Sequence, residues 1–127
     1  MVPKDLLYTD QHEWIRVEGD VGTVGITDHA QRSLGDLTFV ELPATGSDVA
    51  KGAEAAVVES TKAAADVYSP AAGKVAEVNE SLEDDPGAVN RDPYGDGWMF
   101  KVALSDKSEL GGLLSPDKYA EFCGDEA

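Results

Sequence analysis

The sequence predicts an all-β fold with short peripheral helices, arranged as an antiparallel sandwich or barrel. Short runs rich in Val, Ile, Tyr and Phe recur along the chain, and each is only a few residues long. Gly, Pro, Asp and Asn separate these runs at short intervals, as the turns between antiparallel strands require. The segments with helical character are short, so we expect them at the edge of the strand core.

A hairpin followed by a helix is predicted near the start of the chain. The stretch "HEWIRVEGDVGTVGIT" carries alternating apolar residues on both sides of a Gly19-Asp20 turn. In "TDHAQRSLGD", Thr27 or Asp28 can cap the N-terminus of a helix. Gly35 suits the left-handed position at its C-terminus.

Several short strands are predicted in the middle of the chain. "DLTFVELP" is a strand that proline ends. Gly46 and Gly52 flank a short strand, and another begins at Ala55. In "AADVYSPAAGKVAEVNE" two further strands are interrupted at Pro70 and at Gly73.

The last third of the chain predicts one strand and one better helix. "ESLEDDPGAVN" is a helical turn and loop, and "DPYGDGWMFKVAL" ends in a strand whose apolar residues alternate over 98–104. Ser115 can cap the final helix, Pro116 suits its first position, and Gly124 should end it. Glu80 to Asp85 lack the spacing of a calcium loop and read as a solvated acidic face.

Length and charge limit the classes of function. The 127 residues fit a single domain over 1–127, with a core over about 8–104 and a C-terminal helical extension over about 106–123. Ten basic against 25 acidic residues give a formal net charge of -15. This balance argues against binding to nucleic acid or an anionic membrane, because both require a clustered basic surface. It favours partners with basic docking surfaces.

Cysteine and histidine usage argues against a disulfide scaffold and a metal site. Cys123 is the one cysteine, and His12 and His29 are the two histidines, without ligand spacing. The first ten residues, "MVPKDLLYTD", have no signal-peptide core, and no apolar run can span a bilayer. We therefore expect a monomeric cytoplasmic product, with a processed mitochondrial form left open.

One basic residue in "VVESTKAAADVYSP" points to function. Strand-forming residues lie on both sides of Lys62, so "STKA" is expected at a hairpin tip. Lysines are common solvated surface residues, and that is the simplest interpretation. However, small neighbours leave this amine accessible, as enzymatic acylation of a lysine requires. A catalytic Schiff-base lysine needs a desolvating pocket, and nothing in this stretch supplies one.

Five blocks in order carry a resemblance to a known family. They are "HEWIRVEGD", "VGITDHAQRSLGDLTFVELP", "VVESTKAAADVYSP", "GKVAEVNESLEDDPGAVN" and "DPYGDGW". From Tyr8 to about Phe122 the sequence resembles the glycine cleavage system H proteins, which carry a lipoyl group. The resemblance implies a barrel-sandwich hybrid like that of lipoyl and biotinyl domains, with the modified lysine at a β-hairpin tip and a C-terminal helix.

The resemblance also implies a role. Lys62 would carry lipoic acid as an amide, attached by a lipoate-attaching enzyme. The arm would take an aminomethyl group from a pyridoxal-phosphate glycine decarboxylase (P protein) to a tetrahydrofolate-dependent aminomethyltransferase (T protein). A dihydrolipoamide dehydrogenase (L protein) would reoxidise it. The chain would then be a carrier of the glycine cleavage system and not itself an enzyme.

Further residues match family positions. Glu59, Asp66 and Gly73 match positions implied to guide lipoyl attachment and to shape the tip. Glu13, His29 and Asp66 match positions implied to line a cleft that receives the arm. The sequence departs from the family at Gln11 and Ala65, where small hydroxyl residues are common, so a contact from position 11 to the arm would have to come from an amide.

Two alternatives stay open. The chain could be a lipoyl or biotinyl module of another multienzyme complex, although such modules are shorter and usually carry "DKA" or "MKM" at the tip. It could also be an unmodified binding protein, or a relay that passes lipoyl groups to other proteins. The residues around Lys62 argue against loss of the modification and leave the relay role open.

Overall fold

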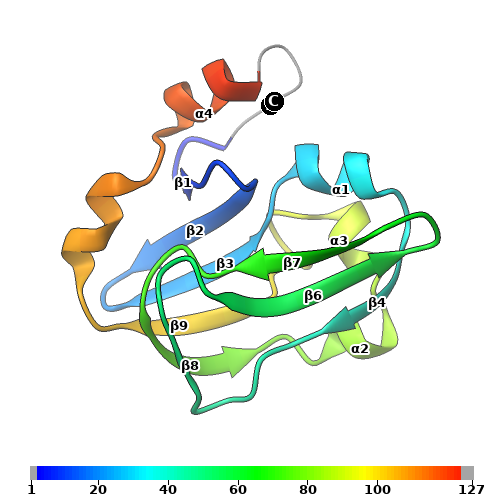
Figure 1. The fold of residues 1–127 in the computed structure, drawn as a ribbon, viewed down its shortest axis with the longest axis horizontal. Helices are drawn as coiled ribbons and strands as arrows, with labels where there is room; N and C mark the ends of the chain where they lie inside the picture. The colour runs from blue at the N-terminus through cyan, green and yellow to red at the C-terminus, as the bar shows by residue number, and fades with distance from the viewer. Residues whose placement is uncertain (1–2, 124–127) are drawn as a thin grey trace.

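The computed structural model describes residues 3–123, which form two antiparallel sheets packed on each other with short helices at the periphery. The strands are β1 (Leu7–Tyr8), β2 (Glu13–Glu18), β3 (Val21–Ile26), β4 (Leu37–Glu41), β5 (Asp48–Val49), β6 (Glu54–Ser60), β7 (Ala64–Tyr68), β8 (Gly73–Val78) and β9 (Phe100–Leu104). The helices are α1 (Asp28–Leu34), α2 (Ser81–Asp84), α3 (Ala88–Arg91), α4 (Pro116–Cys123) and the 3₁₀ helix η1 (Lys107–Gly112). The predicted all-β class is confirmed (Figure 1).

The two sheets have simple strand orders. One is six-stranded in the order β1-β2-β3-β9-β8-β5, and the other is three-stranded in the order β4-β6-β7. The predicted first hairpin is confirmed: Ile15 pairs with Val24, and Glu18 pairs with Val21 across the turn. Gly19 adopts a φ of 62° in that turn, a value that glycine adopts without the steric cost of a Cβ.

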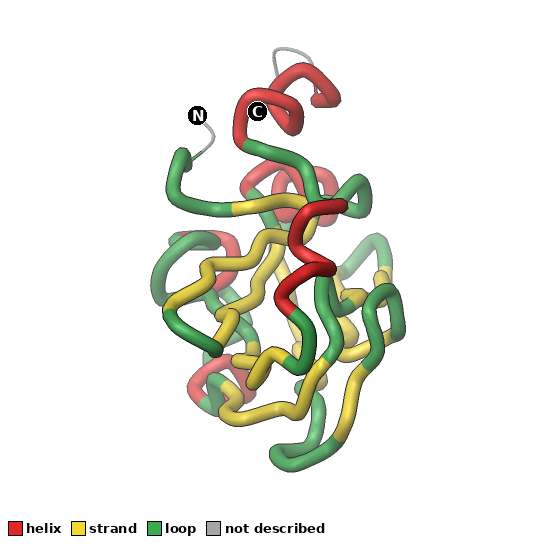
Figure 2. Tube along the Cα trace, turned by 90° about the vertical axis from the view of Figure 1, so that its left-hand side faces the viewer, coloured by secondary structure: helices red, strands yellow, loops and turns green. Residues whose placement is uncertain are grey.

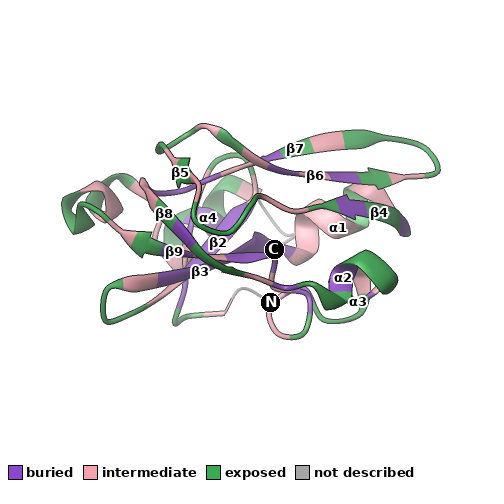
Figure 3. Cartoon of the chain, turned by 90° about the horizontal axis from the view of Figure 1, so that it is seen from below, coloured by how far each residue is buried: buried purple, intermediate pink, exposed green. Residues whose placement is uncertain are grey.

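The main core lies between the two layers, where the buried residues of Figure 3 face each other. Val58 and Val67 point into it from the smaller sheet, and Val102 and Phe100 from the larger one, each no more than 1% exposed. A second cluster lies on the other side of β2, where Trp14 packs with Tyr8 and Tyr119. Strand β2 therefore has apolar packing on both faces.

Helix α1 has the predicted caps. The Thr27 side chain accepts a hydrogen bond from the backbone N–H of Ala30 at 3.3 Å, and Gly35 follows the helix with a φ of 83°. Asn90 of α3 joins this end of the helix to β4, because its amide donates to the Gly35 carbonyl at 2.8 Å and its oxygen accepts from Leu37 N–H at 2.9 Å.

The C-terminal segment returns to the start of the chain. Tyr8 and Leu114 exchange two backbone hydrogen bonds of 2.9 and 2.7 Å, so α4 lies beside β1 at one end of the molecule (Figure 2). Ser115 accepts from Lys118 N–H at 3.2 Å, which confirms the predicted cap. The predicted stop at Gly124 lies outside the described residues.

The expected last strand begins later than the alternating residues suggest. It starts at Phe100, and before it the Trp98 carbonyl accepts a side-chain hydrogen bond from Asn79 at 2.7 Å. Within residues 3–123, no helix combines the length and the apolar character needed to cross a membrane.

Candidate functional site

Lys62 lies at the tip of the predicted hairpin, between β6 and β7, where the loop projects from the molecule (Figure 1). Ser60 shapes this tip. Its N–H donates to the Ala63 carbonyl at 2.7 Å, and its hydroxyl oxygen accepts from the N–H groups of Lys62 and Ala63 at 3.3 and 3.1 Å. The turn is therefore ordered by its own hydrogen bonds, while the Lys62 side chain is exposed.

The lysine amine extends along the C-terminal end of α1. A Cβ placed on Gly35 would lie 3.3 Å from Lys62 Cε and 3.8 Å from its Nζ. None of the ion pairs formed among residues 3–123 involves Lys62. The amine is thus presented on a defined surface, and no carboxylate of the described part of the chain forms an ion pair with it.

Glu59 and Asp66 flank the tip on one face of the hairpin. Glu59 pairs with Ala64, and Asp66 pairs with Val57, so these four side chains share the face of the sheet that looks away from the core. Both carboxylates are exposed. Their place beside Lys62 suits the predicted recognition role, which stays a prediction.

Gly73 is not brought to the tip. It lies in β8 of the larger sheet, paired with Leu104 on one side and Val49 on the other. A Cβ at this position would lie 2.1 Å from the Ala103 carbonyl oxygen and 2.6 Å from a Val102 methyl group. The close approach of β9 accounts for a glycine here without any role in shaping the hairpin tip.

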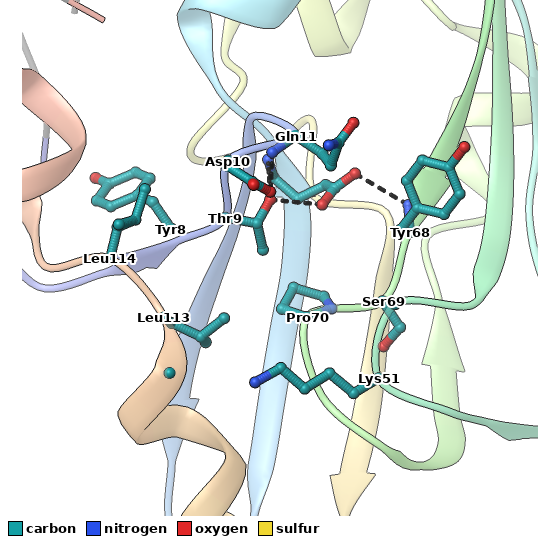
Figure 4. Close-up of a pocket in the computed structure, with 13 residues that line it drawn as sticks. Tyr8, Thr9, Asp10, Gln11, Lys51, Tyr68, Ser69, Pro70, Leu113 and Leu114 are labelled. Atoms are coloured by element: carbon teal, nitrogen blue, oxygen red, sulfur yellow. Dashed lines mark hydrogen bonds between the residues drawn. The ribbon is translucent and has the colours of Figure 1, made fainter. Parts of the chain in front are cut away.

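A cavity of about 450 Å³ opens where the beginning of the chain, the end of β7 and the C-terminal segment meet. In Figure 4, residues after β7 face residues of β1 and of the C-terminal segment across this space. Its lining consists of Tyr8, Thr9, Asp10, Gln11, Glu13, Lys51, Gly52, Tyr68, Ser69, Pro70, Gly112, Leu113 and Leu114. The cavity combines an apolar wall with several oxygen acceptors.

Glu13 is the buried acid of this cavity, with only 2% of its surface exposed. The Thr9 hydroxyl donates to its Oε1 at 2.6 Å, and the backbone N–H of Tyr68 donates to its Oε2 at 3.0 Å. Since Tyr68 belongs to the other sheet, this carboxyl joins the two layers. Burial raises the pKa of Glu13 to about 7, although its two hydrogen bonds act in the opposite direction.

The structure separates the three residues that the family resemblance assigned to the cleft. Glu13 lines the cavity. Gln11, where the sequence differs from the residue common in the family, lines it as well. His29 does not line it, and instead stacks on His12 with a distance of 4.3 Å between ring centroids. Asp66 is exposed on β7 and is also not part of the lining.

Sequence reasoning missed most of the cavity wall. Thr9, Tyr68 and the Gly112–Leu114 segment come from three distant parts of the chain, and their local patterns mark only a loop, a strand end and a turn. The one available signal concerned Glu13. It stands two residues before Ile15 on the same face of β2, so strand alternation places it inward. Among residues 3–123 no cluster of three or more potential metal ligands occurs.

Stability should depend on pH through Glu13. Its folded pKa of about 7 lies above the ordinary value of 4.5, so the folded state binds this proton more tightly than the unfolded state. The free energy of unfolding therefore falls by up to about 3 kcal/mol as pH rises through the window between these values. Glu13→Gln keeps the shape and removes the titration. Its stability relative to the unsubstituted chain should increase across this window.

Urea unfolding of both chains at several pH values measures that difference. The contributions of the other carboxyl groups to the pH dependence cancel in this difference, because both chains contain them. A difference that is flat between pH 4.5 and pH 7 would show that Glu13 titrates normally in the folded state.

Comparisons with known proteins cover nearly the whole chain. The family model described as "Glycine cleavage H-protein" matches residues 6–126. The glycine cleavage system H protein of Carboxydothermus hydrogenoformans is 53% identical over 126 residues, covering 99% of this chain and 97% of that protein. The protein of the same name from Xanthomonas campestris pv. campestris is 58% identical over 127 residues, with 99% and 97% covered.

A solved structure agrees with the fold. The crystal structure of a glycine cleavage system H protein from Mycobacterium marinum superposes with a TM-score of 0.89 at 42% sequence identity. The superposition covers 97% of this chain and 99% of that one. This likeness confirms the predicted barrel-sandwich arrangement. With the match of the family model to nearly the whole chain, it shows that the chain belongs to the glycine cleavage H-protein family.

Proposed function

We propose that the chain is the lipoyl carrier of a glycine cleavage system and that it holds the lipoyl group as an amide on Lys62. The observation that carries this assignment is the exposed Lys62 side chain at an ordered hairpin tip, in a chain of the H-protein family. Amide formation removes the charge of the amine. A terminal disulfide on a flexible arm would supply two-electron chemistry and a sulfur that accepts a one-carbon unit.

The residues of the cavity fit such an arm and an amine-bearing cargo. Leu113, Leu114 and Pro70 offer apolar surface for an alkyl chain. The Glu13 carboxyl, the Gln11 amide and Asp10 offer oxygen acceptors for an amine. The cavity that the structure describes is thus chemically suited to hold a loaded arm out of water, as the resemblance implied.

Glu13 has a defined part in this proposal. Its pKa of about 7 means that near neutral pH the carboxyl can be protonated or ionised at little cost. An ammonium group beside it would favour the ionised form, because an opposite charge stabilises the carboxylate. Glu13 would then accept a hydrogen bond from the cargo while it keeps the bond from Tyr68 N–H.

The specific partners belong to the same proposal. A glycine decarboxylase, a tetrahydrofolate-dependent aminomethyltransferase and a dihydrolipoamide dehydrogenase would act in turn on the arm, and catalysis would reside in them. The net charge of -15 supports docking to basic surfaces on these enzymes. We also propose a monomeric chain in the cytoplasm, a compartment that keeps a lone thiol such as Cys123 reduced.

Attachment should depend on the acids beside the tip. We expect Glu59→Gln and Asp66→Asn each to lower kcat/KM for lipoylation by a purified lipoate ligase by about fivefold, since each removes a charge that a basic enzyme surface can approach. Glu54→Gln is the matched control, because Glu54 is exposed on the same strand at its far end. Incorporation is followed by intact mass.

Equal rates for all three variants would remove Glu59 and Asp66 from the recognition surface. Failure of the unsubstituted chain to accept any lipoyl group would count against the carrier assignment itself. The two outcomes are separate because the second does not depend on the substitutions.

A further inference from the structure

Tyr119 of α4 lies directly behind the wall of the cavity. It is fully buried, and its ring stacks on Tyr8 with centroids 4.5 Å apart and planes 9° from parallel. Tyr8 lines the cavity, and its backbone pairs with Leu114, which lines the cavity as well. The side chain of Tyr119 therefore packs against the same short segments that form the cavity wall.

The Tyr119 hydroxyl lies in the centre of a hydrogen-bond chain. It is 2.7 Å from His12 Nδ1 and 2.7 Å from Thr27 Oγ1. Burial and the neighbouring His29 both lower the pKa of His12, so its ring is neutral at neutral pH. Both hydrogen bonds form together when the Thr27 hydroxyl donates to the Tyr119 oxygen and the Tyr119 hydroxyl donates to the unprotonated Nδ1 of His12.

His12 has an unusual backbone. With a φ of 67° it is the one non-glycine residue in the left-handed region among residues 3–123. Such a conformation costs on the order of 1 kcal/mol for a residue with a Cβ, so surrounding contacts must hold it. Those contacts include the bond to Tyr119, the stacking on His29 and two backbone bonds, from Thr27 N–H to the His12 carbonyl at 3.0 Å and from His12 N–H to the Thr9 carbonyl at 3.2 Å. Cys123 Sγ also lies 3.9 Å from His12 Nδ1, and the ring of Phe122 lies 5.7 Å away between centroids.

The position of His12 in the chain connects this strain to the cavity. His12 stands between Gln11 and Glu13, and both neighbours line the cavity. A relaxation of φ at this residue would rotate the chain on either side. It would therefore move the Glu13 carboxyl away from Tyr68 N–H, its partner across the two sheets.

We propose that Tyr119 is a positioning residue of the cavity: its hydroxyl holds His12 in the left-handed conformation, and His12 in turn holds the Glu13 carboxyl at the end of β7. The geometry assigns the C-terminal helix a part in the site, although α4 contributes no lining residue. That this geometry serves a lipoyl arm rests on the proposed function. The geometry itself is tested without the arm.

Tyr119→Phe keeps the ring stacking and removes the hydroxyl. In the full-length chain without lipoate, we expect exchange of the Tyr68 amide hydrogen to accelerate by about three- to tenfold relative to other slowly exchanging amides of β6 and β7. The titration of Glu13, followed by its carboxyl carbon resonance, should move from about 7 toward the ordinary value of 4.5. Water would then reach a loosened carboxyl.

Tyr94→Phe is the matched control. Tyr94 packs in the same apolar cluster, and its hydroxyl accepts from Asp28 N–H at 2.9 Å, but it forms no bond to His12. If Tyr119 contributed only to general stability, both variants would be affected alike. The ratio of the Tyr68 amide exchange rate to the rates of the other slowly exchanging amides of β6 and β7 would then stay unchanged. The proposal is overturned when Tyr119→Phe leaves the Tyr68 amide and the Glu13 titration at their original values, or when Tyr94→Phe shifts them equally.

His12→Ala provides a second, independent variant. Alanine keeps the Cβ, and so the cost of the positive φ, but cannot bond to Tyr119, so it should reproduce both effects of Tyr119→Phe. Adding Tyr119→Phe to His12→Ala should have no further effect, since the link between the two residues is already removed. Unchanged Tyr68 exchange in His12→Ala would overturn the proposal even where Tyr119→Phe does not fold. None of these results bears on lipoylation of Lys62, which is measured separately.

Discussion

Lys62→Arg should abolish glycine cleavage in a system reconstituted from this chain and the three proposed partner enzymes. Arginine keeps the positive charge and the length of the side chain but offers no primary amine for an amide bond with lipoate. Because Lys62 is exposed and forms none of the ion pairs described above, the free energy of unfolding should change by no more than about 0.5 kcal/mol. Loss of activity would therefore not reflect loss of the fold.

Lys118→Arg is the control for this experiment. Lys118 is also exposed, on α4, and lies far along the chain from the hairpin tip. The control should keep full activity and accept lipoate at the normal rate. Glycine cleavage by Lys62→Arg above the background of a reaction without the carrier would refute the assignment of Lys62.

Gly73→Ala should produce the largest loss of stability among the substitutions considered. The added Cβ would lie 2.1 Å from a backbone oxygen of Ala103, and backbone in the middle of a sheet cannot move as a side-chain end can. We expect a loss of about 3 kcal/mol or more in the free energy of unfolding, at or above the upper end of typical overpacking costs. Urea unfolding measures this loss.

Gly111→Ala is the matched comparison, since a Cβ at that glycine meets no atom within 4 Å. It should change stability by less than about 0.5 kcal/mol. The folded fraction of Gly73→Ala should still accept lipoate on Lys62, because Gly73 serves the packing of β8 on β9 and not the hairpin tip. Normal stability with defective lipoylation would instead support the role at the tip that the family resemblance implied.

Local signals in the sequence were sufficient for most of the fold. The caps of α1 at Thr27 and Gly35, the first hairpin and the tip around Lys62 were all predicted, because each depends on residues close together in sequence. The pairing of β3 with β9 depends instead on contacts between distant segments, and nothing in either strand specifies its neighbour.

The candidate site could be predicted only in part, for the same reason. The hairpin tip at Lys62 was predicted from neighbouring residues in the sequence, while the lipoyl group on this lysine was implied only by the family resemblance. The cavity joins the residues around Thr9, the end of β7 and the segment before α4, and no sequence pattern connects these three. His29 illustrates the limit: its position on α1 was predicted correctly, but its side chain stacks on His12 and does not enter the cavity.

The most direct test of the carrier assignment is the intact mass of the chain purified from its own cells, followed by peptide mapping. The assignment predicts one lipoyl increment per chain, located on the peptide that contains Lys62, and its absence in Lys62→Arg. A chain that carries no lipoyl group in cells that lipoylate other proteins, or that carries it on another lysine such as Lys51 or Lys101, would contradict the assignment.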